Sequence, residues 1–276
     1  QHIFIYHPQF FPLTRLTNSL WDDTDPAFSH DGTKLAYASN QNGNWDIYIL
    51  DLQTYQLTNF TDTESYESHP SWSPDDQWLV FESDRNGNLD IFIQSTTSDG
   101  DQPIQLTLSE VDDFHPSWSP DGRQIAYTSL ESGNEDIWLA NLDTVEDRYQ
   151  NISQQPESIE LEPFWSPNND QLFWAGKQNL GQLIIQETDS VVEPIKNIVS
   201  GSIGTFHPQG DAMAVGFHSA EGSHLGVYDI TTGTMKFPFQ SMPGRITGIT
   251  WGNQNLELLL PLLNQSSAST SPADWQ

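Results

Sequence analysis

One short motif returns along the chain at a nearly constant interval, and this repeat constrains the fold more than any other feature. Four copies share a polar residue, a proline, an aromatic residue and a Ser-Pro-Asp-type turn: Asp25-Pro-Ala-Phe-Ser-His-Asp-Gly32, His69-Pro-Ser-Trp-Ser-Pro-Asp-Asp76, His115-Pro-Ser-Trp-Ser-Pro-Asp-Gly122 and Glu162-Pro-Phe-Trp-Ser-Pro-Asn-Asn169. Two weaker copies follow, around Phe206 and Trp251. Equivalent positions are 44, 46, 47, 41 and 45 residues apart. Such a period is typical of one four-stranded propeller blade and is too long for a leucine-rich or hexapeptide solenoid.

Each repeat reads as a succession of short β-strands. Residues 72–81 contain a strand end, a Pro-Asp turn and an apolar strand. A glycine turn follows, and the next strand begins at Asp46, Asp90 or Asp136 in the first three repeats. Because no long segment has helical periodicity, the chain is all-β. We expect a six-bladed β-propeller with four-stranded antiparallel blades at about residues 18–58, 59–107, 108–153, 154–199, 200–240, and 241–263 together with 1–17.

The two ends of the sequence are expected to complete one blade together. Residues 3–6 match the third strand of a repeat, whereas residues 246–251 and 256–262 match a first and a second strand. Joining strands from both termini closes a propeller and leaves no open sheet edge. We therefore expect a single domain over residues 1–263, followed by a flexible Ser-rich tail at 264–276.

These repeats resemble a known family. The apolar–Ser–Pro–Asp–Gly pattern, followed by Ser83-Asp-Arg-Asn-Gly-Asn-Leu-Asp-Ile-Phe92, is similar to the PD40, or TolB-like, repeat of WD40-like β-propellers, and the likeness extends over residues 3–262. The resemblance implies an exported envelope protein of the bacterial periplasm. It also implies a propeller that engages other envelope proteins, among them a peptidoglycan-associated lipoprotein. The first residue is Gln1, which we interpret as the start of a processed form without its signal peptide.

Four polar residues precede the proline at the start of successive innermost strands: Asp25, His69, His115 and Glu162. Ile203 and Gly248 hold the same position in the two weaker repeats. Because innermost strands line the channel of a propeller, we expect these side chains to form one layer near a channel mouth. Imidazoles with a carboxylate suit a divalent cation, which would be held by His69, His115 and Glu162. The alternative is a wet channel in which these groups bind only water.

Acidic residues gather in the loops that lead into those strands. The expected acidic rim consists of Asp22, Asp23, Glu64, Glu67, Asp112, Asp113 and Glu160. These loops should surround one mouth of the channel, where carboxylates would attract a cationic protein or peptide. The alternative is an ordinary solvated surface, because the chain has 9 Lys and Arg against 38 Asp and Glu, a formal net charge of -29. Adaptation to a salty habitat would give the same balance.

Composition and motifs exclude several classes of protein. So negative a chain cannot neutralise the phosphates of a nucleic acid. No apolar run is long enough to cross a bilayer, and the absence of cysteine excludes disulfides and thiolate chemistry. No Gly-x-Ser-x-Gly, His-Glu-x-x-His or phosphate-binding loop motif occurs.

Together these features predict a non-enzymatic, monomeric interaction propeller that binds a cationic protein or peptide. Two alternatives remain open. Some propellers of related repeat type are metal-dependent lyases of acidic oligosaccharides. In such an enzyme, the metal ligands would be His69, His115 and Glu162. The second alternative is a structural docking subunit of a larger assembly.

Overall fold

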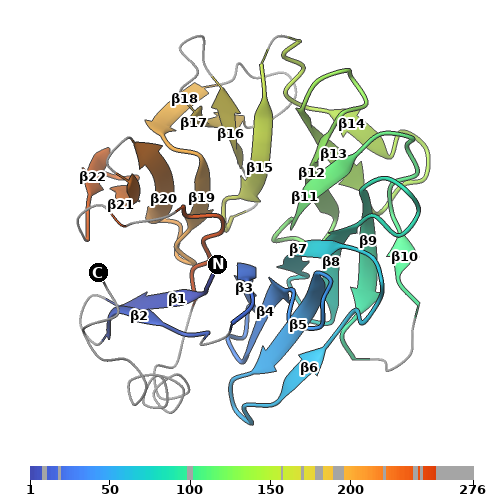
Figure 1. The fold of residues 1–276 in the computed structure, drawn as a ribbon. Coiled ribbons are helices and arrows are strands. Elements are labelled where there is room, and N and C mark those ends of the chain that lie inside the picture. Colours follow the sequence, from blue (N-terminus) through green and yellow to red (C-terminus); the bar gives the residue numbers. More distant parts are fainter. Residues whose placement is uncertain are drawn as a thin grey trace.

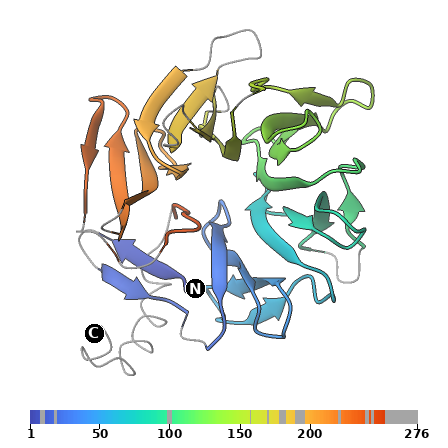
Figure 2. The same cartoon turned by 45° about the horizontal axis from the view of Figure 1, so that its top comes forward.

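The structure, a computed structural model, contains an all-β propeller of antiparallel sheets (Figure 1). It describes the chain except for residues 8–10, 18–19, 98–101, 157, 169–170, 178–182, 189–195, 220–221, 239–241, 243–244 and 253–276. The described strands form five four-stranded sheets and one two-stranded sheet. The sheets follow one another around a ring in the order of the sequence (Figure 2). The predicted all-β propeller is thereby confirmed.

The strands have the following bounds. The two-stranded sheet consists of β1 (Phe4–His7) and β2 (Phe11–Arg15). The first two four-stranded sheets are β3 (Asp23–Phe28), β4 (Lys34–Ser39), β5 (Asp46–Asp51) and β6 (Leu57–Asn59), then β7 (Glu67–Trp72), β8 (Trp78–Ser83), β9 (Asp90–Ser95) and β10 (Ile104–Gln105). The next two are β11 (Asp113–Trp118), β12 (Gln124–Ser129), β13 (Asp136–Asn141) and β14 (Tyr149–Asn151), then β15 (Glu160–Trp165), β16 (Leu172–Lys177), β17 (Leu183–Thr188) and β18 (Lys196–Ser200). The last is β19 (Ile203–Phe206), β20 (Ala212–Ser219), β21 (Gly222–Asp229) and β22 (Thr234–Lys236).

The Ser-x-Asp part of the repeat builds the turn between the first two strands of a sheet. In the first copy, the Ser29 hydroxyl donates to Asp31 over 2.8 Å and accepts the backbone N–H of Lys34 over 2.9 Å. The same two bonds recur in the second and third sheets. The recurrent Ser-Pro-Asp sequence therefore encodes a turn whose side chains replace backbone hydrogen-bond partners.

The hydrophobic core lies mainly between neighbouring sheets. One cluster joins Val80 and Ile91 to Ile125 and Tyr127, and another joins β15 and β16 to β19 and β20. The repeated aromatic residue reaches across the same boundaries. The Trp72 indole N–H donates to the Ala27 carbonyl of the preceding sheet over 3.0 Å, as Trp165 does to Ser117 over 3.2 Å. These aromatic residues thus pack neighbouring sheets together.

The chain near residue 248 lies between the last and the first four-stranded sheets. A Cβ at Gly248 would come 3.0 Å from Asp25 Cα, and one at Gly216 would come 3.1 Å from Ile249 Cδ1. The Thr24 and Thr247 hydroxyls are 2.9 Å apart. Residues 246–251 nevertheless do not form the first strand that the sequence predicts there. The expected strand at 256–262 and the tail at 264–276 lie outside the described residues.

No helix suited to crossing a membrane occurs in the part of the chain that the structure describes.

Candidate functional site

An unusual backbone conformation marks the four channel residues predicted from the repeat. Asp25, His69, His115 and Glu162 have φ angles of 49, 50, 53 and 58°. Each lies where the register between the first and second strands of its sheet shifts, as at a β-bulge. Positive φ is uncommon for residues other than glycine, and a residue before proline normally adopts extended backbone. The same strained backbone conformation occurs in each of the first four four-stranded sheets, at one polar residue per sheet.

The four side chains form a continuous chain of contacts across four sheets. Asp25 Oδ1 lies 3.6 Å from His69 Nε2, and Glu162 Oε1 lies 3.7 Å from His115 Nε2. Between these pairs, the His69 and His115 rings are 4.2 Å apart, measured between centroids. The Ser68 hydroxyl donates to Asp25 Oδ2 over 2.7 Å. The structure therefore brings together all four residues in the order that the repeat predicts.

Glu82 joins this cluster from the second strand of its sheet, β8. Its Oε1 accepts from His69 Nδ1 over 3.0 Å and from the Tyr66 hydroxyl over 3.3 Å. Its Oε2 accepts the backbone N–H of His115 over 2.8 Å. Only 3% of the Glu82 side chain is exposed, against 20% for His69. Glu82 thus binds both histidines, the ring of His69 and the backbone of His115.

Glu82 was not predicted as a site residue, although the sequence distinguishes it from the equivalent residues of the other repeats. Glu82 pairs with Ser68 in the β7–β8 ladder. The equivalent positions of the neighbouring sheets hold Ala38, Thr128 and Ala175. A single carboxylate at a register otherwise occupied by small or neutral residues points to a local function.

Charges in the cluster shift the pKa values of the central pair in opposite directions. Burial opposes the charged form of His69, but the Glu82 and Asp25 carboxylates outweigh it and raise its pKa to about 10. Burial likewise opposes ionised Glu82, but the His69 charge and hydrogen bond lower its pKa to about 2. His69 and Glu82 therefore form an ion pair at neutral pH.

Burial determines the direction of the pKa shifts of His115 and Glu162. Burial, helped by the charge on His69, lowers the pKa of His115 to about 3. Burial raises the pKa of Glu162 to about 7, although the charge on His69 opposes this. His115 is therefore neutral, and its buried Nδ1 has no hydrogen-bond partner among the residues that the structure describes.

The structure divides the expected acidic rim into surface and interior groups. Asp23, Glu67, Asp113 and Glu160 are each at most 2% exposed. They begin β3, β7, β11 and β15. The carboxylates of Glu67, Asp113 and Glu160 accept from hydroxyl groups, as Glu67 does from Ser83 over 2.9 Å. Glu67 also pairs with Arg85 over 3.0 Å. Their expected place on an open rim is wrong, because the first position of each inner strand faces the protein interior.

The remaining rim residues stay at least partly accessible. Glu64 is exposed, whereas Asp22 and Asp112 are half-buried. The same set of loops also carries large exposed apolar side chains. Leu20 and Trp21, in the loop before β3, are 103% and 42% exposed, and Leu108, before β11, is 77% exposed. These loops therefore present apolar as well as acidic groups to solvent.

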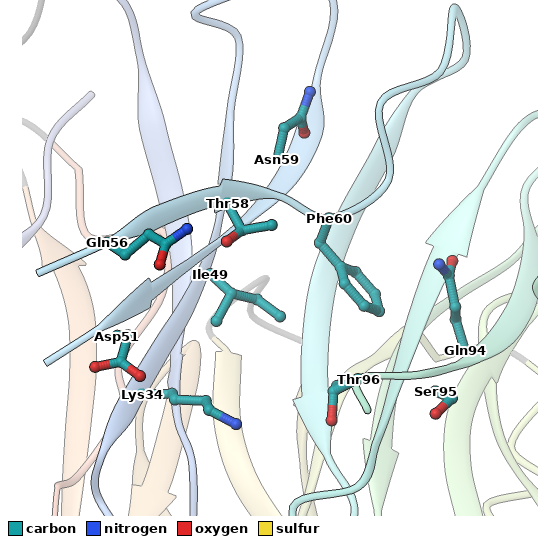
Figure 3. Close-up of a pocket in the computed structure, with 10 residues that line it drawn as sticks. All are labelled: Lys34, Ile49, Asp51, Gln56, Thr58, Asn59, Phe60, Gln94, Ser95 and Thr96. Atoms are coloured by element: carbon teal, nitrogen blue, oxygen red, sulfur yellow. The ribbon is translucent and has the colours of Figure 1, made fainter. Parts of the chain in front are cut away.

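A separate pocket lies between the first two four-stranded sheets and does not include the channel cluster. It has a volume of about 410 Å³ and is lined by β4, β5, β6 and β9 residues, among them Lys34, Asp51 and Gln94 (Figure 3). The Lys34 ammonium lies 5.9 Å from the centre of the Trp72 ring. Its lining mixes polar side chains with Ile49 and Phe60, and its titratable groups are Lys34 and Asp51.

Comparison with known proteins gives a match for part of the chain. Residues 15–102 match the family model PD40, described as TolB beta propeller domain. No curated protein sequence matches the chain.

Solved structures extend the likeness over most of the fold. TolB from Acinetobacter baumannii superposes with a TM-score of 0.71 at 19% identity, over 85% of this chain and 58% of that one. A putative TolB from Agrobacterium tumefaciens gives 0.74 at 17% identity, over 87% of this chain and 90% of that one. An oligogalacturonate lyase in complex with manganese gives 0.56 at 15% identity, over 86% and 84%. The chain spans 58% of the length of the Acinetobacter protein. At these identities the structures establish a shared propeller fold, and the resemblance to TolB-like, PD40 propellers that the repeat predicts is confirmed.

Proposed function

We propose that this chain is a non-enzymatic interaction propeller that binds a cationic segment of another protein at the channel mouth bearing Asp25, His69, His115 and Glu162. The observation that carries this proposal is the contact chain formed by these four residues across four sheets. A structural role alone would not need the same strained, left-handed backbone at four polar positions. Strain of this kind persists where the surrounding structure holds a side chain in place for a task.

Charge favours a cationic partner. The His69–Glu82 ion pair is internally neutral, so the remaining negative charge of the cluster comes from Asp25 and, in part, from Glu162, whose pKa is about 7; Glu64 adds to it from a loop. The chain as a whole carries -29 charges, which attract cations from a distance. A Lys or Arg side chain, or an amino terminus, fits such a mouth.

Exposed apolar residues favour a protein over a free small cation. Leu20, Trp21 and Leu108 stand in loops of the same type as the acidic ones. Aromatic and aliphatic side chains beside charges are the usual anchors of protein interfaces. A basic segment with apolar neighbours is therefore the partner that the mouth suits best.

We also propose that residues 1–263 form one six-bladed domain. Its last blade combines β1 and β2 with the chain beyond residue 245. The position of residues 246–250 between β20 and β3 supports this arrangement. By analogy with the TolB structures, we propose an exported, periplasmic protein that is a monomer by itself.

A capture experiment tests the function. Wild-type protein and the double variant Asp25→Asn, Glu162→Gln are immobilised and exposed to bacterial envelope extract in a buffer containing a chelator. Both substitutions keep the side-chain shape and remove charge, and asparagine tolerates positive φ. We expect a basic protein to be retained by the wild type, eluted by salt, and lost in the variant.

A matched control separates the site from overall charge. Glu146 and Asp147 are exposed in the loop between β13 and β14, and Asp147 also has positive φ. At a pH of about 8.5, where Glu162 is ionised as well, the variant Glu146→Gln, Asp147→Asn makes the same charge change on an outer surface. Equal retention by all three proteins would place the interaction elsewhere and contradict the proposal.

A metal-dependent lyase acting on an acidic oligosaccharide remains the alternative function. The solved lyase in complex with manganese shares the fold, and Arg245 is a described basic residue whose charge acts on Glu162. Cleavage of an acidic oligosaccharide by elimination would create an unsaturated product that absorbs ultraviolet light. Such a product, formed by wild-type protein, would favour this alternative. Retention of the chain in a stable complex of unchanged composition would instead favour a docking subunit.

A further inference from the structure

We propose that His69, Glu82 and His115 form a binding site for a divalent transition-metal ion, with Asp25 and Glu162 as the outer carboxylates that orient the two histidines. This inference goes beyond the proposed function and does not depend on it.

Donor atoms of the three residues converge. One ligand atom from each of His69, Glu82 and His115 lies within 4.8 Å of the other two. Ligands of a tetrahedral ion with bonds of about 2.1 Å are about 3.4 Å apart, so contraction of at most about 1.4 Å completes the site. The residues come from β7, β8 and β11, in two adjacent sheets, and one ion would bridge them.

The second nitrogen of each histidine has the partner that metal-bound histidines usually have. His69 Nε2 faces Asp25 over 3.6 Å, and His115 Nε2 faces Glu162 over 3.7 Å. Histidine ligands commonly direct their other ring nitrogen to a carboxylate, which fixes the ring and strengthens the ligand. The two histidines repeat this arrangement, which leaves Nδ1 of each ring for the ion.

His115 Nδ1 gives independent support. It is buried, and none of the described residues forms a hydrogen bond with it. A buried polar atom without a partner costs about 1–3 kcal/mol, so such atoms usually mark a functional constraint or a missing ion. The Glu82 carboxylate already binds both neighbours, accepting from His69 Nδ1 over 3.0 Å and from the His115 backbone N–H over 2.8 Å. A cation placed between the three groups satisfies the free lone pair and replaces the proton between His69 and Glu82, which leaves to solvent.

The donor set selects the class of ion. Two imidazoles and one carboxylate suit Zn²⁺, Co²⁺ or Mn²⁺, whereas Ca²⁺ requires six to eight oxygen ligands. Three protein ligands leave a fourth position for water or for a donor from a bound partner. The side chains of His69 and His115 are 20% and 19% exposed, so the ion can enter from the channel.

Metal titration without any partner tests the site. Chelator-treated wild-type protein is titrated with Zn²⁺ by calorimetry, and metal content is measured after gel filtration. We expect one ion per chain, a raised Tm and no response to Ca²⁺. Co²⁺ should give visible absorption bands of a nitrogen-ligated ion, a readout that requires no variant.

Variants then locate the ion. His115→Gln and Glu82→Gln should abolish binding, whereas Glu162→Gln should weaken it by about 10–100-fold. The control is His207→Gln, because His207 also faces a carboxylate, Asp211, over 2.7 Å but lies in the turn between β19 and β20. Circular dichroism of each variant without metal confirms folding. Absence of binding and of Co²⁺ bands in folded wild type, or unchanged affinity in folded His115→Gln, overturns the proposal. The capture experiment contains a chelator, so either proposal can fail while the other stands.

Discussion

His69 and His115 occupy equivalent positions in neighbouring sheets, and their rings face each other with centroids 4.2 Å apart and planes at 58°. Both residues have φ near 50°, so the contact depends on the same backbone irregularity occurring twice. Burial, together with repulsion by the charge on His69, keeps the His115 ring neutral. The pair divides the cluster into a charged half, with Asp25 and Glu82, and a half in which neutral His115 lies beside Glu162, whose pKa is about 7.

Relieving the strained backbone at Glu162 should stabilise the protein. Glu162→Gly removes an unfavourable left-handed conformation and a half-buried carboxyl group, so the free energy of unfolding should rise by about 0.5–1 kcal/mol. Chemical denaturation measures it. Glu131→Gly, a control at an exposed turn position with negative φ, should not stabilise. A lower stability of Glu162→Gly would show that the conformation is not strained.

Asp76 joins the first two four-stranded sheets through one carboxylate. It accepts the backbone N–H groups of His30 and Asp31 over 2.7 and 2.9 Å, and its own φ is 58°. The third and fifth sheets hold Gly122 and Gly210 in the corresponding turn. Asp76→Ala should cost about 2 kcal/mol, because it loses both bonds and keeps the strain. Asp76→Gly loses only the bonds and should cost less, and Asp76→Asn least. Thermal denaturation ranks the three variants, and an equal loss for Gly and Ala would contradict the role of strain.

Gly204 is required by close packing between the fourth and fifth four-stranded sheets. A Cβ there would lie 2.7 Å from Phe164 Cζ. Gly204→Ala should therefore destabilise the protein by about 1–3 kcal/mol. Adding Phe164→Leu should restore part of this loss, and a double-mutant cycle in denaturant measures the coupling. Additive effects would mean that the two residues do not press on each other.

Buried tyrosines should make the fold sensitive to alkali. Burial, together with the Asp23 carboxylate and the Tyr48 hydroxyl, raises the pKa of Tyr37. The unfolded chain ionises this tyrosine near pH 10 while the folded chain does not, so its contribution is complete below pH 10 and is lost as pH rises further. The free energy of unfolding should fall by up to about 1.4 kcal/mol per pH unit for each such residue. Tyr37→Phe should flatten this slope in denaturation measured at pH 9 to 11, and an unchanged slope would contradict the assignment.

Much of the fold follows from the repeat, because each copy contains its own turn chemistry. Ser29, Asp31 and their equivalents are close in sequence and form the same turn each time. Ring closure depends instead on contacts between residues far apart, such as Thr24 with Thr247. Residues 246–251 have the apolar pattern of a strand but do not form one, because apolar spacing alone does not determine strand pairing.

The channel site was predictable only where it obeys the repeat. Asp25, His69, His115 and Glu162 share one position, so their neighbourhood in space follows from the order of the blades. Glu82 breaks the pattern of its own position and was missed. The acidic rim was overpredicted because sequence cannot distinguish an exposed carboxylate from a buried one such as Glu160, which binds the hydroxyls of Ser153 and Ser158.

The most direct test of the account is the association rate of a fluorescent oligolysine peptide, measured by stopped flow in chelator at increasing salt. Raising ionic strength from about 0.01 to 1 M shortens the Debye length from about 30 to 3 Å, so electrostatic steering should disappear. We predict that the rate for wild type falls by at least about tenfold. At low salt, Asp25→Asn, Glu162→Gln should slow association more than the matched outer-loop variant Glu146→Gln, Asp147→Asn. Equal slowing by both variants, or a rate that does not change with salt, would contradict binding at the channel mouth.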